Sequence, residues 1–174
     1  LLCRLVEYCN EETKEHPYFI GTDYSVDAVT LAKAVLTRRG EQWVADDVKE
    51  DRTAKNHNEV EFLVDNILQS CVRDHSVDVF LDKGTFDAMS CLYDDYRGTV
   101  RMQTYVKTLA RLGKPGKSVL CLTTANFTKK EIKDMFSASG WEFVNQVKYP
   151  VFSFGGGTGS HVNTLLYRLR DHHG

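Results

Sequence analysis

The stretch with the clearest potential for chemistry is VDVFLDKGTFDA, residues 77–88. Its apolar first half, interrupted only by Asp78, is typical of a buried parallel strand. This half ends abruptly in Asp82, Lys83 and Gly84. Open α/β sheets bind ligands at the carboxyl ends of their strands, so these polar residues would face a ligand crevice. A surface turn uses the same residue types, and the pattern alone leaves that alternative open.

Two further acidic positions follow predicted strands. Asp23 ends a strand in YFIGTD, and Asp46, next to Asp47, ends a short strand expected over residues 42–45. Together with Asp82 they would line one edge of one sheet. A carboxylate after the second strand of a nucleotide-binding α/β unit accepts hydrogen bonds from ribose hydroxyls, and an acid one strand further can accept from an adenine amino group. Alternatively, Asp23 only stabilises the start of a helix, and Asp46 belongs to a solvated turn.

Strands and helices are expected to alternate along nearly the whole chain. Alternation of apolar and β-branched runs with helical periods predicts strands over 18–25, 42–45, 77–81, 118–126, 141–150 and 161–170, and helices over 1–9, 26–40, 60–72, 99–112 and 128–140. Thr128 and Glu131 have the spacing of a capping box. The pattern predicts an α/β fold with a doubly wound, mainly parallel sheet. The last two strands lack an intervening helix, so we expect an antiparallel pair at the sheet edge.

Composition excludes several function classes. The 174 residues are 42% hydrophobic with a net charge of -2, which fits one domain over residues 1–174 and gives no basic surface for nucleic acid. No apolar run approaches the ~20 residues of a membrane-spanning helix. The five cysteines form no CxxC pair, and the terminal His172 and His173 are typical of a solvated tail. No metal site is therefore expected. Reduced thiols in the cytosol or nucleus are the simplest interpretation.

Four segments carry a resemblance to a known family: GTDYSVDAVTLA, DKGTFDA, LTTANFTKKEI and FSFGGGTGS, in this order. Over nearly its whole length the chain resembles the class I, S-adenosylmethionine-dependent methyltransferases of the elongation factor 1-alpha lysine methyltransferase 2 family. DKGTxDA also occurs in a related subgroup, whereas the phenylalanine-rich late segment favours the named family. The resemblance implies a protein-lysine N-methyltransferase with S-adenosylmethionine as cofactor and elongation factor 1-alpha as substrate. We also expect a monomer in the cytoplasm, with the nucleus as a further location.

The resemblance also implies a cofactor site. Asp23 matches the acid that binds the cofactor ribose, and Tyr24 and Ser25 follow it in the same loop. Asp46 matches the acid near the adenine, with Asp47 as the alternative register.

Catalytic and substrate-binding positions are implied as well. Asp82, Lys83, Gly84 and Thr85 match the loop beside the methionine end of the cofactor and the incoming lysine, so Asp82 is expected to contact both. The positions that match the substrate entrance are Asn126, Phe127, Phe152 and Phe154. The aromatic side chains would form apolar walls for the lysine stem, or would simply be core residues.

The implied reaction is direct transfer, in which a neutral lysine amine attacks the sulfonium methyl in line. Because lysine is protonated near neutral pH, a proton must leave, and Asp82 would accept it or hold the lysine head by charge. Lys83 is expected to brace the loop by pairing with Asp87 or Asp82.

The chain departs from the family pattern in one important respect. The family's first strand and its glycine-rich GxGxG turn are expected before Leu1, and neither is in the sequence. FGGGTGS cannot replace the turn because it opens no helix. Each buried backbone group left unpaired by a missing central strand would cost about 1–3 kcal/mol, so we expect marginal stability and weak cofactor binding. A non-catalytic interaction module, another protein substrate and a dinucleotide oxidoreductase remain alternatives.

Overall fold

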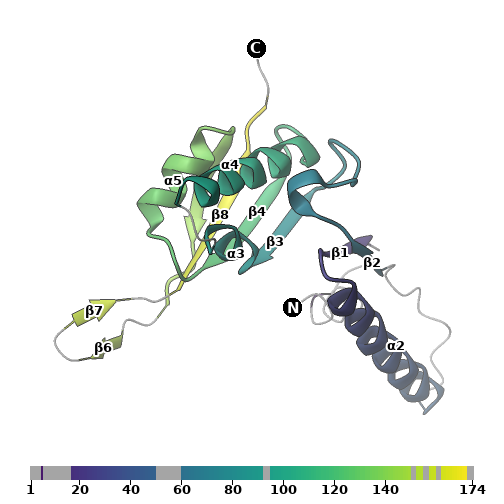
Figure 1. Cartoon of the computed structure of the whole chain (residues 1–174). Coiled ribbons are helices and arrows are strands. Elements are labelled where there is room, and N and C mark those ends of the chain that lie inside the picture. Colours follow the sequence, from purple (N-terminus) through teal and green to yellow (C-terminus); the bar gives the residue numbers. More distant parts are fainter. Residues whose placement is uncertain are drawn as a thin grey trace. The chain divides into compact units, whose positions relative to one another are not determined.

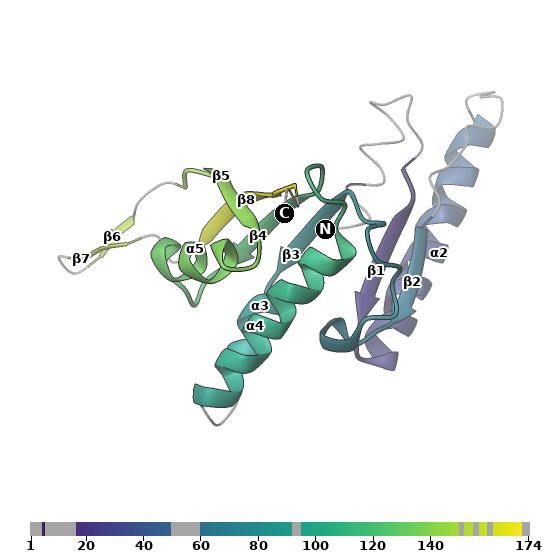
Figure 2. The same cartoon turned by 90° about the horizontal axis from the view of Figure 1, so that it is seen from above.

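The computed structural model describes residues 5, 17–49, 60–91, 95–149, 152–154, 157–159 and 162–171. The chain forms two compact units, Leu1–Gln69 and Ser70–Gly174, which we call the N-terminal unit and the C-terminal unit and describe separately. Figures 1 and 2 draw their elements from two directions. Of the helix expected over residues 1–9, only Leu5 is described, and it is helical; the remainder lies outside the described residues.

The N-terminal unit is built on two parallel strands. β1 (Phe19–Asp23) leads into the long helix α2 (Val26–Lys49), and the chain returns as β2 (Val60–Val64), followed by the single 3-10 turn η1 (Ile67–Gln69). β1 and β2 pair in parallel, with Phe19 opposite Val60 and Asp23 opposite Val64. This register brings the carboxyl ends of both strands to the same edge.

Two secondary-structure predictions in this unit are wrong. Residues 42–45 are not a strand but part of α2, which continues through Gly40. A glycine inside a helix costs about 1 kcal/mol relative to alanine, which is too little to end a helix when both sides favour it. The segment predicted as a helix over residues 60–72 instead contains β2 and η1, since the β-branched and aromatic run VEFLV pairs with β1.

The C-terminal unit contains a four-stranded sheet in the order β3-β4-β8-β5. Its elements are β3 (Val79–Lys83), α3 (Thr85–Ser90), α4 (Asp95–Leu112), β4 (Val119–Thr124), α5 (Lys129–Ser137), β5 (Trp141–Gln146) and β8 (Asn163–Leu169). β3 and β4 are parallel, whereas β8 runs antiparallel to both β4 and β5. The predicted α/β architecture with an antiparallel last strand is therefore confirmed, and the last two strands pair at one side of the sheet, with β5 at the edge and β8 between β4 and β5.

A short hairpin lies between β5 and β8 in the sequence. β6 (Phe152–Phe154) and β7 (Gly157–Gly159) pair antiparallel as a separate two-stranded sheet. The segment predicted as a glycine-rich loop therefore contains paired backbone. The side chains of these residues lie outside the description.

The core of the C-terminal unit lies between the sheet and its helices. In β4 every second residue is buried, with Leu120 and Leu122 fully so. α5 contributes Ile132 and Phe136 to this core, and Thr128 begins the helix with the predicted capping box. Figure 1 shows α4 and α5 lying across the sheet. The candidate catalytic residues lie at the carboxyl end of β3, which pairs with β4 in this sheet.

Candidate functional site

The N-terminal unit presents an open carboxylate at the end of β1. Asp23 is exposed, and its Oδ1 accepts a hydrogen bond of 2.8 Å from the backbone N–H of Ser25, which closes a tight turn. Ser25 in turn accepts from the N–H of Ala28 and caps α2. Tyr24, between them, is 82% exposed. Within the described residues Asp23 Oδ2 accepts no hydrogen bond, so this oxygen is available to a ligand.

A second acid, missed by the sequence reasoning, lies beside Asp23. Asp65 directly follows β2, and its backbone N–H donates to the Asp23 carbonyl oxygen at 2.9 Å, which extends the parallel ladder by one residue. Asp65 is half-buried at the carboxyl end of the sheet. The signal was present, because VEFLVD repeats the pattern of YFIGTD, a short β-branched and aromatic run ending in an acid.

The strand-end argument for Asp46 and Asp47 is therefore wrong. Both residues belong to α2, and no strand ends at either one. Asp65 occupies the strand-end position that the sequence analysis assigned to Asp46.

The C-terminal unit holds a very different carboxylate at the end of β3. Asp82 is 6% exposed. Its Oδ1 accepts from the Thr85 N–H at 2.8 Å, and its Oδ2 accepts from the Phe86 N–H at 3.0 Å and from the Tyr105 hydroxyl at 2.6 Å. Because three internal donors occupy both oxygens, the geometry favours Asp82 as the cap of α3 over a proton acceptor.

The loop after Asp82 has a fixed backbone and exposed side chains. Gly84 has a φ of 92°, a left-handed conformation that favours glycine, and its N–H donates to the Thr123 carbonyl oxygen at 3.3 Å. Lys83 and Thr85 on either side are exposed. We call residues 82–85 the DKGT loop.

Asp87, not Lys83, fastens this loop to the neighbouring strand. Its Oδ1 accepts from the Thr124 hydroxyl, and its Oδ2 accepts from the Ala125 N–H at 3.0 Å. In the part of the chain that the structure describes, Lys83 forms no ion pair. The prediction that Lys83 braces the loop is therefore wrong.

The predicted substrate residues after β4 are divided between surface and core. Asn126 is exposed, one residue beyond the contact of Asp87 with Ala125. Phe127 is half-buried, its ring lies 5.0 Å from the fully buried Phe86, and its carbonyl oxygen accepts from Asn163. Phe127 therefore contributes to packing, as the core alternative predicted. For Phe152 and Phe154, only their position in β6 is described.

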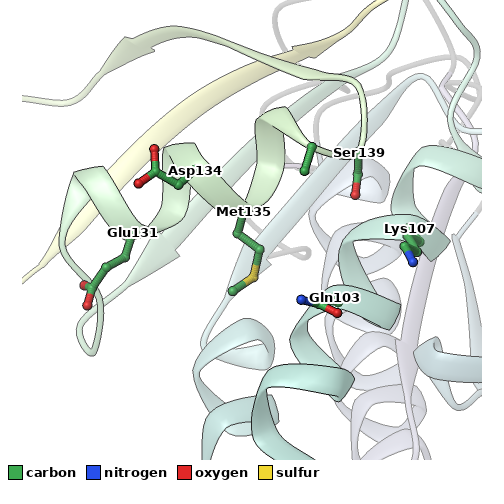
Figure 3. Close-up of a pocket in the computed structure, with 7 residues that line it drawn as sticks. Gln103, Lys107, Glu131, Asp134, Met135 and Ser139 are labelled. Atoms are coloured by element: carbon green, nitrogen blue, oxygen red, sulfur yellow. The ribbon is translucent and has the colours of Figure 1, made fainter. Parts of the chain in front are cut away.

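A separate hollow of about 650 Å³ lies between α4 and α5. Figure 3 draws the residues that line it. Its lining residues are Gln103, Lys107, Glu131, Asp134, Met135, Ala138 and Ser139. None of the predicted site residues lines it.

The described ranges contain neither a metal-binding cluster nor a membrane-spanning helix. They contain no group of three or more His, Cys, Asp and Glu side chains placed to hold a metal ion. No helix among them combines the length and apolarity needed to cross a membrane.

Comparison with curated proteins finds lysine methyltransferases. The chain is 29% identical over 148 residues to EEF1A lysine methyltransferase 2 of Homo sapiens, covering 85% of this chain and 54% of that protein. It is 29% identical over 169 residues to the protein-lysine N-methyltransferase efm4 of Schizosaccharomyces pombe, covering 97% and 65%. The chain thus spans between half and two thirds of the length of these relatives.

Comparison with solved structures supports the fold. An S-adenosylmethionine-dependent methyltransferase from Methanosarcina mazei superposes with a TM-score of 0.63 at 14% identity, covering 96% of this chain and 87% of that one. No family model matches the chain. By sequence, the chain is similar to EEF1A lysine methyltransferase 2 and efm4, and its fold is similar to that of S-adenosylmethionine-dependent methyltransferases.

Proposed function

We propose that this protein is a lysine N-methyltransferase that transfers a methyl group from S-adenosylmethionine to a lysine of translation elongation factor 1-alpha. The observation that carries the proposal is the pair of acids at the ends of β1 and β2, Asp23 and Asp65. The substrate follows from the relatives, two of which are named for lysine methylation and one for EEF1A.

The N-terminal unit fits the nucleoside part of the cofactor. The exposed Asp23 carboxylate has Oδ2 available for the ribose hydroxyls, and Tyr24 offers an exposed aromatic side chain next to it. Asp65, at the end of the adjacent strand, would interact with the adenine. The cofactor would supply an electrophilic methyl group, and these residues would hold and orient it.

The C-terminal unit fits the reacting lysine. β3 and β4 end at one edge, with Lys83 opposite Thr123 in the register. The exposed Thr85 and Asn126 there offer polar groups to orient the amine. In-line transfer depends mainly on such positioning, and with Asp82 occupied by internal donors the lysine proton would pass to solvent.

We further propose that both units belong to one methyltransferase domain, and that the protein is a cytoplasmic monomer, also possible in the nucleus. The segments that carry the family resemblance fall in both units, which supports the first proposal. The scattered cysteines without a CxxC pair support a reducing compartment.

The test is methylation of purified elongation factor 1-alpha by the full-length protein with S-adenosylmethionine, read by peptide mass spectrometry. We expect one lysine to gain methyl groups. Cofactor binding with an unmodified elongation factor would overturn the substrate, and a different protein methylated in a cell extract would identify the alternative. Absence of cofactor binding by calorimetry would overturn the methyltransferase assignment itself.

A further inference from the structure

Tyr105 of α4 is a buried residue in direct contact with the candidate site. It is 2% exposed, its hydroxyl donates to Asp82 Oδ2 at 2.6 Å, and its ring centroid lies 5.8 Å from that of Phe86. Burial, followed by the charge of Asp82, raises the pKa of Tyr105 well above its ordinary value. The hydroxyl is therefore a neutral donor at physiological pH.

Asp82 supplies the cap that the start of α3 would otherwise lack. The residue at the N-cap position is Gly84, which has no side chain to accept from the first N–H groups of the helix. Asp82 reaches past it and accepts from the N–H groups of Thr85 and Phe86. The exposed Lys83 and the left-handed Gly84 lie inside the ring that these hydrogen bonds close.

The Tyr105 hydroxyl is the only one of these three donors that comes from outside the β3–α3 segment. Without it, Asp82 Oδ2 keeps one local partner, and the buried carboxylate can turn toward another donor. This rotation weakens the bonds to Thr85 and Phe86. The conformation of the DKGT loop would then no longer be fixed by α4.

We propose that Tyr105 is a positioning residue for methyl transfer: through Asp82 it fixes the DKGT loop, and with it the exposed Thr85, beside the incoming lysine. The inference rests on the proposed function, because the loop has a catalytic role only if the protein is a lysine methyltransferase. No contact of Tyr105 with cofactor or substrate is required.

The test compares Tyr105→Phe with a matched control, Tyr167→Phe, in the full-length protein. Both tyrosines are buried in the C-terminal unit, but the Tyr167 hydroxyl has no hydrogen-bond partner among the described residues. We expect Tyr105→Phe to lower kcat by about tenfold to about 100-fold at an unchanged KM for S-adenosylmethionine, since the cofactor nucleoside is held elsewhere. Tyr167→Phe should leave both constants unchanged.

Amide hydrogen exchange provides a readout that does not need activity. Thr85 and Phe86 should exchange faster in Tyr105→Phe than in wild type and in Tyr167→Phe, while the amides of β4 keep their protection. An unchanged kcat in Tyr105→Phe, or unchanged exchange at Thr85 and Phe86, overturns the positioning role. Faster exchange in Tyr105→Phe, combined with a wild-type protein that methylates nothing, would instead keep the structural link and overturn the proposed function.

Discussion

Asp23 and Asp82 are the same residue type at the same kind of position, the end of a parallel strand, yet the two units use them in opposite ways. Asp23 is exposed and engages one oxygen in a local turn. Asp82 is buried, and three donors occupy both of its oxygens. The difference teaches that a strand-end acid becomes a ligand-binding group only where the surrounding chain leaves an oxygen free.

Removing each carboxylate in turn should give the largest difference between the two acids. Asp82→Ala leaves the Phe86 N–H and the Tyr105 hydroxyl buried without an acceptor, and we expect it to lower the free energy of unfolding by about 2–4 kcal/mol. Asp23→Ala removes one exposed turn bond and should change it by only about 0.5 kcal/mol. Urea denaturation measures both. Equal losses would show that the two acids do not differ in role.

Cofactor affinity should depend on the acids of the N-terminal unit, which contribute little to stability. Asp23→Asn and Asp65→Asn each remove the charge from an expected hydrogen bond to the nucleoside, so the Kd for S-adenosylmethionine should rise by about tenfold to about 100-fold. Asp46→Asn is the matched control, because Asp46 lies in α2 and should leave the Kd unchanged. Calorimetry on the full-length protein decides. A larger effect from Asp46→Asn than from Asp65→Asn would restore the original assignment.

Alkaline pH should reduce the free energy of unfolding through a buried tyrosine but not through an exposed one. Burial raises the pKa of Tyr105 well above its ordinary value, so the unfolded chain loses this proton at a lower pH than the folded chain. The stability that the neutral phenol contributes is complete below about pH 10 and is lost as the pH rises through the folded pKa, by roughly 1 kcal/mol per pH unit.

Urea unfolding near pH 9 and near pH 11 tests this expectation. The fall in the free energy of unfolding between the two pH values should be smaller in Tyr105→Phe than in wild type, by roughly 1 kcal/mol. Tyr24→Phe serves as the control, since Tyr24 is 82% exposed and the variant should fall as wild type does. An identical fall in wild type and Tyr105→Phe would contradict the buried phenol.

The smallest effect is expected at Lys83. Because it forms no ion pair within the described ranges, Lys83→Ala should change the free energy of unfolding by no more than about 0.5 kcal/mol. Asp87→Ala, which removes the acceptor for Thr124 and Ala125, should cost clearly more. A large loss in Lys83→Ala would mean that the lysine braces the loop after all.

Much of the fold could be predicted because its signals are local. The apolar run before Asp82 became β3, the spacing of Thr128 and Glu131 became a capping box, and the pair of late strands became the antiparallel β5 and β8. The errors fell where the local signal was weak. A single glycine could not show that α2 runs on to Lys49, and a five-residue strand is recognised chiefly by its pairing.

The candidate site was predicted in part for the same reason. The sequence by itself determined that acids follow the strands ending in Asp23 and Asp82, because a polar residue after an apolar run is visible without any partner. Only the tertiary structure decided that the Asp65 backbone N–H donates to the end of β1. The same holds for Tyr105, distant in sequence, whose hydroxyl donates the third hydrogen bond to the Asp82 carboxylate. Pairing and burial depend on contacts between distant residues, and these contacts separate an acid with both oxygens occupied from an acid that leaves an oxygen open.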